Sequence, residues 1–344
     1  MKNFGKIFTL AVASALAACS GSANKNTEKG EVNVYTQRHY DIDKKVFEDF
    51  TRETGIVVNV VTAGADELLA KLETEAELSP CDLFIAVDAG GLTRAKAKGL
   101  LQAYTSAVIE KNVMPAYRDT EHLWTGLTMR SRVIAVSTDL KVAEPKNYED
   151  LASPIYKGMI LSRSSSSSYN QALLASIIHA GGSETAQNWA KGVVANFARD
   201  PQGNDRDQIK DIAAGKGKIA LINTYYLGKM QISDDPIEKS ALDKVRIIAP
   251  NQDNRGAHIN VSGAGIAKYA KNKSQAQALL DYLVKPEVQR QFAGANQEYT
   301  VDGSFTSEGV LGKLGKFKVD TMPLQILGEK NPEAIQIFDR VGWK

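Results

Sequence analysis

The stretch EVNVYTQRHYDIDKKVFEDFTRETGIVVNVV, residues 31–61, decides the fold because its hydrophobic period changes twice. Residues 31–36 alternate and include β-branched side chains, which is typical of a β-strand. Over residues 41–53 the apolar side chains recur at helical spacing, and Gly55 supplies a stop signal. Residues 56–61 are again β-branched, so the stretch predicts a strand, a helix and a second strand in order.

The same alternation continues through the first hundred residues. We expect a helix over residues 66–77, a buried strand over 82–87 and a short helix over 91–98. Repeated β-α-β order predicts a parallel sheet that helices cover on both faces.

The pattern restarts after Pro154, which indicates a second α/β unit. The further elements that we expect are strands over 133–136, 158–161, 219–222, 245–249 and 263–267, and helices over 170–179, 186–197, 207–214, 274–284 and 287–294. About 315 residues are more than one hydrophobic core usually serves. We therefore predict an α/β fold of two lobes, each a mixed sheet flanked by helices, with a hinge between them. The first lobe is placed at 31–130 plus about 255–305, and the second at about 131–254 plus 306–344.

The amino terminus has the pattern of a secretory signal. Two lysines precede an apolar stretch that is too short to span a bilayer and that ends in small residues. The tetrapeptide LAAC, residues 16–19, resembles the lipobox of bacterial lipoproteins, so we expect residues 1–18 to be removed and Cys19 to be acylated. The alternative is an ordinary signal peptide that is cleaved near Cys19. Residues 19–30 lack apolar side chains beyond an alanine and predict a flexible tether.

Charge and cysteine content exclude several classes of function. Removing residues 1–18 takes two of the 42 basic residues, which leaves as many basic as acidic residues, and this balance gives no reason to expect nucleic acid as a partner. Cys81 then remains alone, so no intramolecular disulfide or paired-cysteine metal site can form, and we interpret it as a small buried hydrophobe.

Tyrosines follow several of the predicted strands. Arg38, His39 and Tyr40 follow the first strand, Tyr169 opens a helix after a serine run, and Tyr225 and Tyr226 follow the strand at 219–222. Because ligands of such folds bind at the carboxyl ends of strands, we expect these side chains to converge on one cleft.

Two adjacent tyrosines can share a ligand only if the backbone turns between strand and helix at that point. Asn223 and Thr224 precede Tyr225 and are suitable capping residues for such a turn. The positive end of a helix is expected to lower the pKa of a tyrosine placed there.

The residue types favour a ferric site. Phenolate is a hard anionic oxygen donor that suits a small trivalent cation, and tyrosinate is an established iron ligand. Four phenolates leave one net negative charge on Fe(III), which Arg38, Arg199 or Lys229 can offset, and His39 would add a neutral fifth donor.

Two other interpretations stay open from the residues alone. A tyrosine at a cleft is often an amphipathic wall residue, so the serine run and helix amino termini can equally indicate a receptor for an oxyanion or a small organic solute. An iron-tyrosinate enzyme would need an open coordination position, and no HExxH or GxSxG motif supports hydrolysis.

At these residues the chain resembles the periplasmic ferric-iron-binding proteins of ABC transporters, specifically the FutA-like branch of the FbpA family. The resemblance extends from about residue 32 to residue 343, through RHY, PCDLFIAVDAG, GLTMRSRVI, VVANFARDPQGND, INTYY and FDRVGW. It implies a class II two-lobed solute-binding fold with Fe(III) as the transported ligand in the cleft.

The resemblance also implies a ligand set: His39 and Tyr40 from the first lobe, and Tyr169, Tyr225 and Tyr226 from the second. With that set no additional anion is required. Other members of the family carry a carboxylate ligand after the strand that matches residues 82–87. This chain has Asp88 there and the extra Tyr169 in place of that ligand, so we expect Asp88 to face the cleft behind the ligands.

The same resemblance implies delivery of iron to a permease and an ATPase of an ABC importer. We expect a lipid-anchored protein of the periplasm or cell envelope. One cleft in each chain requires no partner copy, so we expect a monomer.

Overall fold

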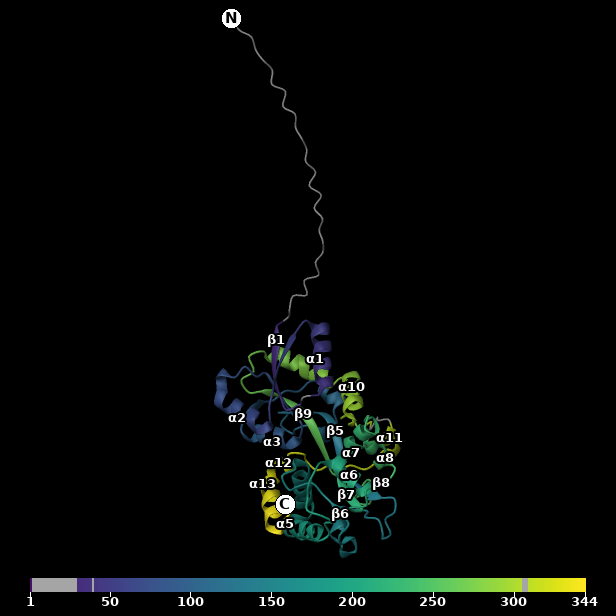
Figure 1. The fold of residues 1–344 in the computed structure, drawn as a ribbon. Coiled ribbons are helices and arrows are strands. Elements are labelled where there is room, and N and C mark those ends of the chain that lie inside the picture. Colours follow the sequence, from purple (N-terminus) through teal and green to yellow (C-terminus); the bar gives the residue numbers. More distant parts are fainter. Residues whose placement is uncertain (2–29, 39, 305–308) are drawn as a thin grey trace.

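The computed structural model describes residues 1, 30–38, 40–304 and 309–344. Cys19, the leader at 1–18, all of the tether before Gly30 and the candidate ligand His39 therefore lie outside the described residues. The described chain forms two lobes, one above the other in Figure 1, with a single curled sheet running through both.

The first lobe is built on the opening stretch of the sequence. Strand β1 (Glu31–Thr36) pairs in parallel with β2 (Val57–Thr62) and β3 (Leu83–Ala86), and helices α1 (Asp41–Thr54), α2 (Ala65–Glu75) and α3 (Ala89–Ala97) connect and flank them. Helix α1 buries Val46, Phe47 and Phe50 and ends at Gly55, whose φ of 75° is left-handed and costs glycine little. The predicted β-α-β rhythm is confirmed here.

Two long strands carry the chain between the lobes. Strand β5 (Thr125–Ser137) pairs antiparallel with β9 (Ile259–Ala267) through residues 125–131, and then with β7 (Ile219–Asn223) through residues 132–136. The sheet order is therefore β2-β1-β3-β9-β5-β7-β6, with β4 (Leu101–Gln102) against β9 and β8 (Val245–Ile248) against β5.

The sequence interpretation was wrong about the lengths of these strands. It placed four residues, 133–136, where β5 has 13, because TGLTMRSR interrupts the apolar run with polar side chains. All 13 residues are buried nevertheless, and several of their polar groups bond inside the protein, among them Ser131 to Thr224 and His258 and Arg132 to Asp205. Strand β9 likewise begins four residues before the expected strand at 263–267.

The second lobe surrounds β6 (Ile160–Leu161), β7 and β8 with helices. These are α5 (Ser168–Ala195), α6 (Asp205–Ala213), α7 (Thr224–Gln231), α8 (Pro236–Leu242) and α13 (Asn331–Val341). The two helices expected over 170–197 are continuous in α5 except for a kink at Gly182, where φ is 80° and ψ is 168°. Trp189, Phe338 and Trp343 close the core of this lobe.

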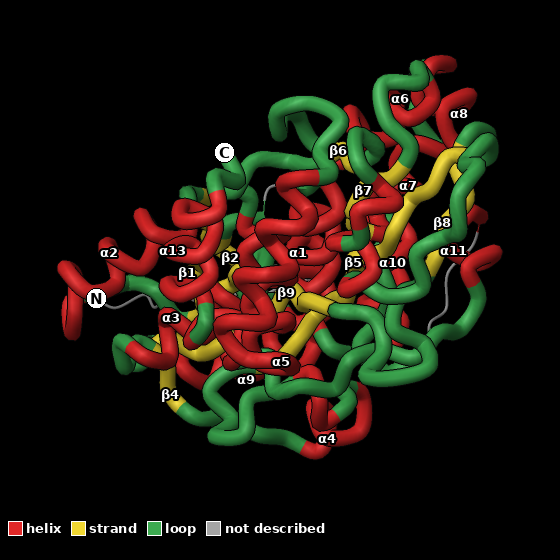
Figure 2. The backbone as a smooth tube through the Cα atoms, turned by 90° about the horizontal axis from the view of Figure 1, so that it is seen from below, coloured by secondary structure: helices red, strands yellow, loops and turns green. Residues whose placement is uncertain are grey.

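The remaining helices complete both lobes. They are α4 (Ala107–Asn112), α9 (Lys273–Leu283), α10 (Pro286–Asn296), α11 (Gly309–Leu314) and α12 (Ile326–Glu329). Helix α12 packs against both α3 and α5, so it contacts elements of the two lobes. Figure 2 shows helices over the middle of the sheet when the molecule is seen from below, with β8 and β4 toward its margins.

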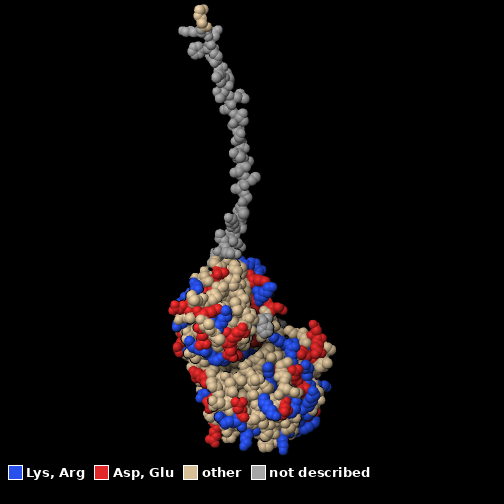
Figure 3. All heavy atoms as spheres, turned by 60° about the vertical axis from the view of Figure 1, so that its left-hand side comes forward, with Lys and Arg blue, Asp and Glu red and all other residues tan. Residues whose placement is uncertain are grey.

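The surface gives little indication of a macromolecular partner. Lysine, arginine, aspartate and glutamate are interspersed over both lobes on the face in Figure 3. Within the described residues, none of the helices combines the length and the apolar character that a membrane crossing demands.

Candidate metal centre

Three tyrosines from both lobes line one small cavity. Tyr40 lies just before α1, Tyr169 is the second residue of α5, and Tyr225 is the second residue of α7. The hydroxyls of Tyr169 and Tyr225 are 3.0 Å apart. The cavity has a volume of about 20 Å³, and its other lining residues are Arg38, Val87, Arg130, Ser262 and Glu298. Roughly 10–15 Å³ holds one water molecule, so the space suits a ligand of ionic size.

The turn that presents Tyr225 and Tyr226 forms as predicted. Residue Asn223 is extended at the end of β7, and α7 begins at Thr224. The adjacent tyrosine rings stack with centroids 4.1 Å apart and an interplanar angle of 30°, so neither points away to the opposite face of a strand.

The predicted capping bond at this turn is absent from α7. The Oδ1 atom of Asn223 accepts a hydrogen bond of 3.4 Å from Arg132, and the hydroxyl of Thr224 accepts one of 3.2 Å from the backbone N–H of Ser131. Both side chains are therefore used to join α7 to β5, which fixes the tyrosines against the strand between the lobes.

A buried ionic cluster lies behind the tyrosines. Asp205 accepts hydrogen bonds from Arg132 at 2.8 Å, from Arg163 at 3.3 Å and from the backbone N–H of Asn223 at 2.7 Å. Arg163 also donates to the hydroxyl of Tyr226 at 3.4 Å. The cluster thus connects a guanidinium directly to one of the candidate ligands.

The same guanidiniums contact a second tyrosine. The Cζ atoms of Arg163 and Arg132 lie 5.0 and 5.9 Å from the ring centroid of Tyr169. Such cation–π geometry places positive charge beside a phenol without neutralising it by an ion pair.

The phenols are held protonated in the metal-free site, contrary to the expectation from helix polarity. Burial raises the pKa of Tyr169 to about 12, with Tyr226 raising it further and Arg130 lowering it. Burial and the neighbouring Tyr169 also raise the pKa of Tyr225 well above 10, and burial followed by Glu298 raises the pKa of Tyr40. Loss of hydration and crowding of like charge outweigh the helix termini because the phenols face one another.

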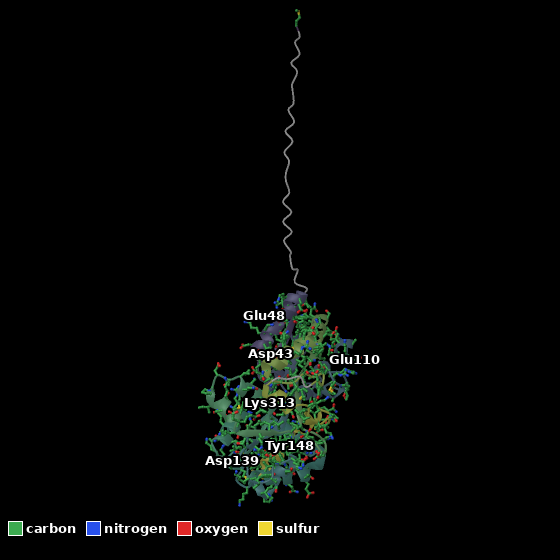
Figure 4. All side chains as sticks on the ribbon, turned by 90° about the vertical axis from the view of Figure 1, so that its right-hand side faces the viewer. Asp43, Glu48, Glu110, Asp139, Tyr148 and Lys313 are labelled. Atoms are coloured by element: carbon green, nitrogen blue, oxygen red, sulfur yellow. The ribbon has the colours of Figure 1, made fainter. Side chains whose placement is uncertain are left out.

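Two of the expected cations adjoin the cavity. Arg38 is 4 % exposed, and its guanidinium binds Asp43 with a shortest distance of 2.7 Å and lies 5.2 Å from the Tyr40 ring. Figure 4 labels Asp43 in the first lobe and the buried Tyr148 in the second. The ammonium of Lys229 lies 4.7 Å from the centroid of Tyr40 and 5.3 Å from that of Tyr225, and burial lowers its pKa.

Arg199 and Asp88 do not line the tyrosine cavity. Arg199 binds Asp211 at 2.7 Å on α6. Asp88 caps α3 by accepting the N–H of Gly91 at 2.7 Å, and it lines a separate cavity of about 540 Å³ between α3 and α5. His39 precedes Tyr40 in the chain but lies outside the described residues.

Sequence reasoning missed the charged side chains around the tyrosines, of which all but Arg163 are buried. These are Arg130, Arg132, Arg163, Asp205 and Glu298. Arg130 and Arg132 are two residues apart in one strand and therefore share a face, and that pattern was available as a signal for a functional charge cluster. In the part of the chain that is described, His, Cys, Asp and Glu form no group of three that could hold a metal.

The chain is similar to known proteins over most of its length. Residues 79–314 match the family model described as bacterial extracellular solute-binding protein. The chain is 40 % identical to "Iron uptake protein A1" of Synechocystis sp., over 99 % of this chain and 97 % of the relative. Among solved structures, Trichodesmium FutA in complex with iron and citrate superposes with a TM-score of 0.87 at 44 % identity, covering 92 % of this chain and all of that one.

A further similar structure is the ferric binding protein from Campylobacter jejuni, with a TM-score of 0.83 and 38 % identity over 91 % of this chain and all of that one. These matches extend over nearly the whole of the chain, and the family model alone covers more than half of it. The chain belongs to the bacterial extracellular solute-binding protein family.

Proposed function

We propose that this chain is a receptor that captures Fe(III) in the cleft between its lobes. The observation that carries the proposal is the convergence of Tyr40, Tyr169 and Tyr225 on one ion-sized cavity, with Tyr226 stacked on Tyr225. Phenolate oxygens are matched to a hard trivalent cation. The names of the relatives, which describe iron uptake and ferric binding, support the same ligand.

The ligands are Tyr40, Tyr169, Tyr225 and Tyr226, with His39 as the fifth. Arg38 lines the cavity and Lys229 lies over the rings of Tyr40 and Tyr225, so both offset charge there. Arg199 pairs with Asp211 on α6 and does not line the cavity. Asp88 lines the neighbouring cavity and is not a ligand of the metal. The role is that of a receptor rather than an enzyme.

Metal binding closes the two lobes. The first lobe consists of residues 31–130 plus about 255–305, and the second of about 131–254 plus 306–344. Strands β5 and β9 support this division because β5 pairs with the first-lobe sheet and then with β7. A metal that bonds to Tyr40 and to the α5 and α7 tyrosines favours the closed state by differential affinity.

The loaded receptor delivers iron to the permease and ATPase of an ABC importer. It acts as a monomer in the periplasm or cell envelope, tethered through acylated Cys19. The LAAC motif supports the tether, and family membership supports the importer.

Titration of the protein that begins at Cys19 with ferric nitrilotriacetate tests the proposal by visible spectroscopy. We expect a phenolate-to-iron charge-transfer band that saturates at about one iron per chain. The band should be lost in a Tyr225→Phe and Tyr226→Phe double variant.

A matched double variant, Tyr104→Phe and Tyr282→Phe, controls for general loss of tyrosine, because these side chains bond to Asp281 and Glu53 away from the cavity. It should retain the band. A wild-type protein that stays colourless would refute iron binding and favour an oxyanion or small organic solute.

A further inference from the structure

Glu298 presents a carboxylate to the tyrosine cavity. It lines the cavity together with Tyr40, Tyr169 and Tyr225, and the residue is 8 % exposed. Its Oε2 atom is buried and has no hydrogen-bond partner in the described part of the chain.

An unpartnered buried carboxylate oxygen is costly, because burial removes the water that would stabilise its charge. The other buried carboxylates nearby are bonded: Asp43 by Arg38, Asp205 by two arginines, and Glu238 by Arg206. Among the described residues, Glu298 is the one Asp or Glu with a buried oxygen left unsatisfied. The unpaired Oε2 atom of Glu298 at this cavity therefore lowers the free energy of unfolding.

The backbone holds Glu298 firmly in place. The preceding residue, Gln297, ends α10 with a φ of 58°, and the N–H of Glu298 bonds to the carbonyl of Ala293 at 3.0 Å. Gly228 on α7 lets this turn approach closely, since a Cβ at Gly228 would collide with Gln297. The turn is thus fixed against the helix that carries Tyr225.

Cations face Glu298 without binding it. The guanidinium of Arg38 is occupied by Asp43, and the ammonium of Lys229 lies over the rings of Tyr40 and Tyr225. No ion pair within 4.0 Å joins Glu298 to a described residue, although the charge of Glu298 raises the pKa of Lys229 against the lowering by burial. The carboxylate is therefore available to a ligand in the cavity.

We propose that Glu298 is a further ligand of the metal, supplying a carboxylate oxygen beside the phenolates. The inference rests on the proposed function of ferric capture. Carboxylate is a hard oxygen donor and suits the same ion as phenolate. With four phenolates and one carboxylate around Fe(III) the site carries two net negative charges, which Arg130 and Lys229 at the cavity can offset.

The test compares Glu298→Gln with wild type by competition against a chelator and by the position of the charge-transfer band. Since even outer partners of metal ligands contribute about 10- to 100-fold to affinity, we expect a loss of about 100-fold or more. The band should move to longer wavelength. A neutral amide donates less electron density to the ferric ion than a carboxylate does, so less energy is needed to transfer an electron from phenolate to iron. Glu238→Gln, which alters a buried carboxylate paired with Arg206 outside the cavity, should change neither quantity.

A double-mutant cycle with Lys229→Met distinguishes two roles of Glu298: direct bonding to the metal, and an indirect effect through the position of Lys229. For a ligand, Glu298→Gln weakens binding and shifts the band in both backgrounds. No effect in the Lys229→Met background, or wild-type affinity and spectrum in Glu298→Gln itself, would overturn the inference.

Glu298→Asp serves if the glutamine variant fails to fold. It keeps the charge but withdraws the oxygen by one methylene, so a ligand role predicts weaker binding and a shifted band, and unchanged binding contradicts it. Absence of a band in wild type would be a failure of ferric capture itself, which is a different result from these.

Discussion

Affinity for iron should depend steeply on pH because the buried phenols must lose protons to bind. The pKa values of Tyr40, Tyr169 and Tyr225 are all raised by burial, that of Tyr169 to about 12. Each of these groups is protonated in the free protein between about pH 6 and pH 9, and each must be ionised in the complex. Affinity is therefore lost as pH falls, by about one decade per proton for every pH unit.

Three such phenols give a change of about 1,000-fold per pH unit in the affinity for free Fe(III), or about 4 kcal/mol. A pH-stat measures this directly as the base consumed when ferric nitrilotriacetate is added to the iron-free protein, with the chelate alone as blank. At least about two net protons should be released per iron near neutral pH, because at least about three phenols each lose a proton and the displaced nitrilotriacetate takes one up, and Tyr169→Phe should release about one fewer. Release of fewer than about two protons by wild type, or an unchanged count in Tyr169→Phe, would refute the reasoning.

Three further predictions follow from other parts of the chain. Asp205→Asn should reduce the free energy of unfolding by about 3–5 kcal/mol in urea denaturation, because it leaves the buried guanidinium of Arg132 and the partly exposed one of Arg163 without their carboxylate. Glu144→Gln at an exposed pair should cost about 1 kcal/mol or less. Gly228→Ala should destabilise the protein by about 1–3 kcal/mol in the same assay, since its Cβ would collide with the turn after α10, while Gly294→Ala meets no atom within 4 Å and should not. Cys19→Ala should abolish incorporation of labelled palmitate into the protein and release it from the membrane fraction, and labelling equal to wild type would contradict the lipobox interpretation.

The regular elements of the fold were predictable where hydrophobic period and stop signals coincide. Strand β1 and helix α1 were placed to within a residue, because alternation, helical spacing and Gly55 all agree there. Strand β5 was not, since its polar residues bond to residues far away in the chain, such as Ser131 to Thr224 and His258, and no local pattern reveals these contacts. The late helices α11 to α13 carry few apolar residues in a row, and they are stabilised by packing on α7, α3 and α5.

The tyrosines of the candidate site could be predicted from the sequence. The charges around them and the shifts of their pKa values could not. The strand-to-helix turns at Tyr169 and Tyr225 follow from local sequence. The direction in which their pKa values shift does not follow from local sequence. It depends on burial and on the 3.0 Å between the hydroxyls of two residues that are 56 positions apart in the chain. Arg132 and Glu298 lie still farther apart in sequence, and only the tertiary structure brings them to the same cavity region.

Raised phenol pKa values favour selectivity rather than oppose binding. Ionising Tyr169 at pH 7 costs about 7 kcal/mol, since its pKa lies about five units higher, and the raised pKa values of Tyr40 and Tyr225 add to this cost. A trivalent ion attracts each phenolate more strongly than a divalent ion at the same distance, because the Coulomb energy scales with charge. At the proposed site, attraction to Fe(III) therefore offsets the free energy of ionising the phenols, and attraction to a divalent ion offsets much less of it. Reduction to Fe(II) removes part of that attraction while the protonation cost stays, so reduction and acidification should both release the metal from the same set of tyrosines.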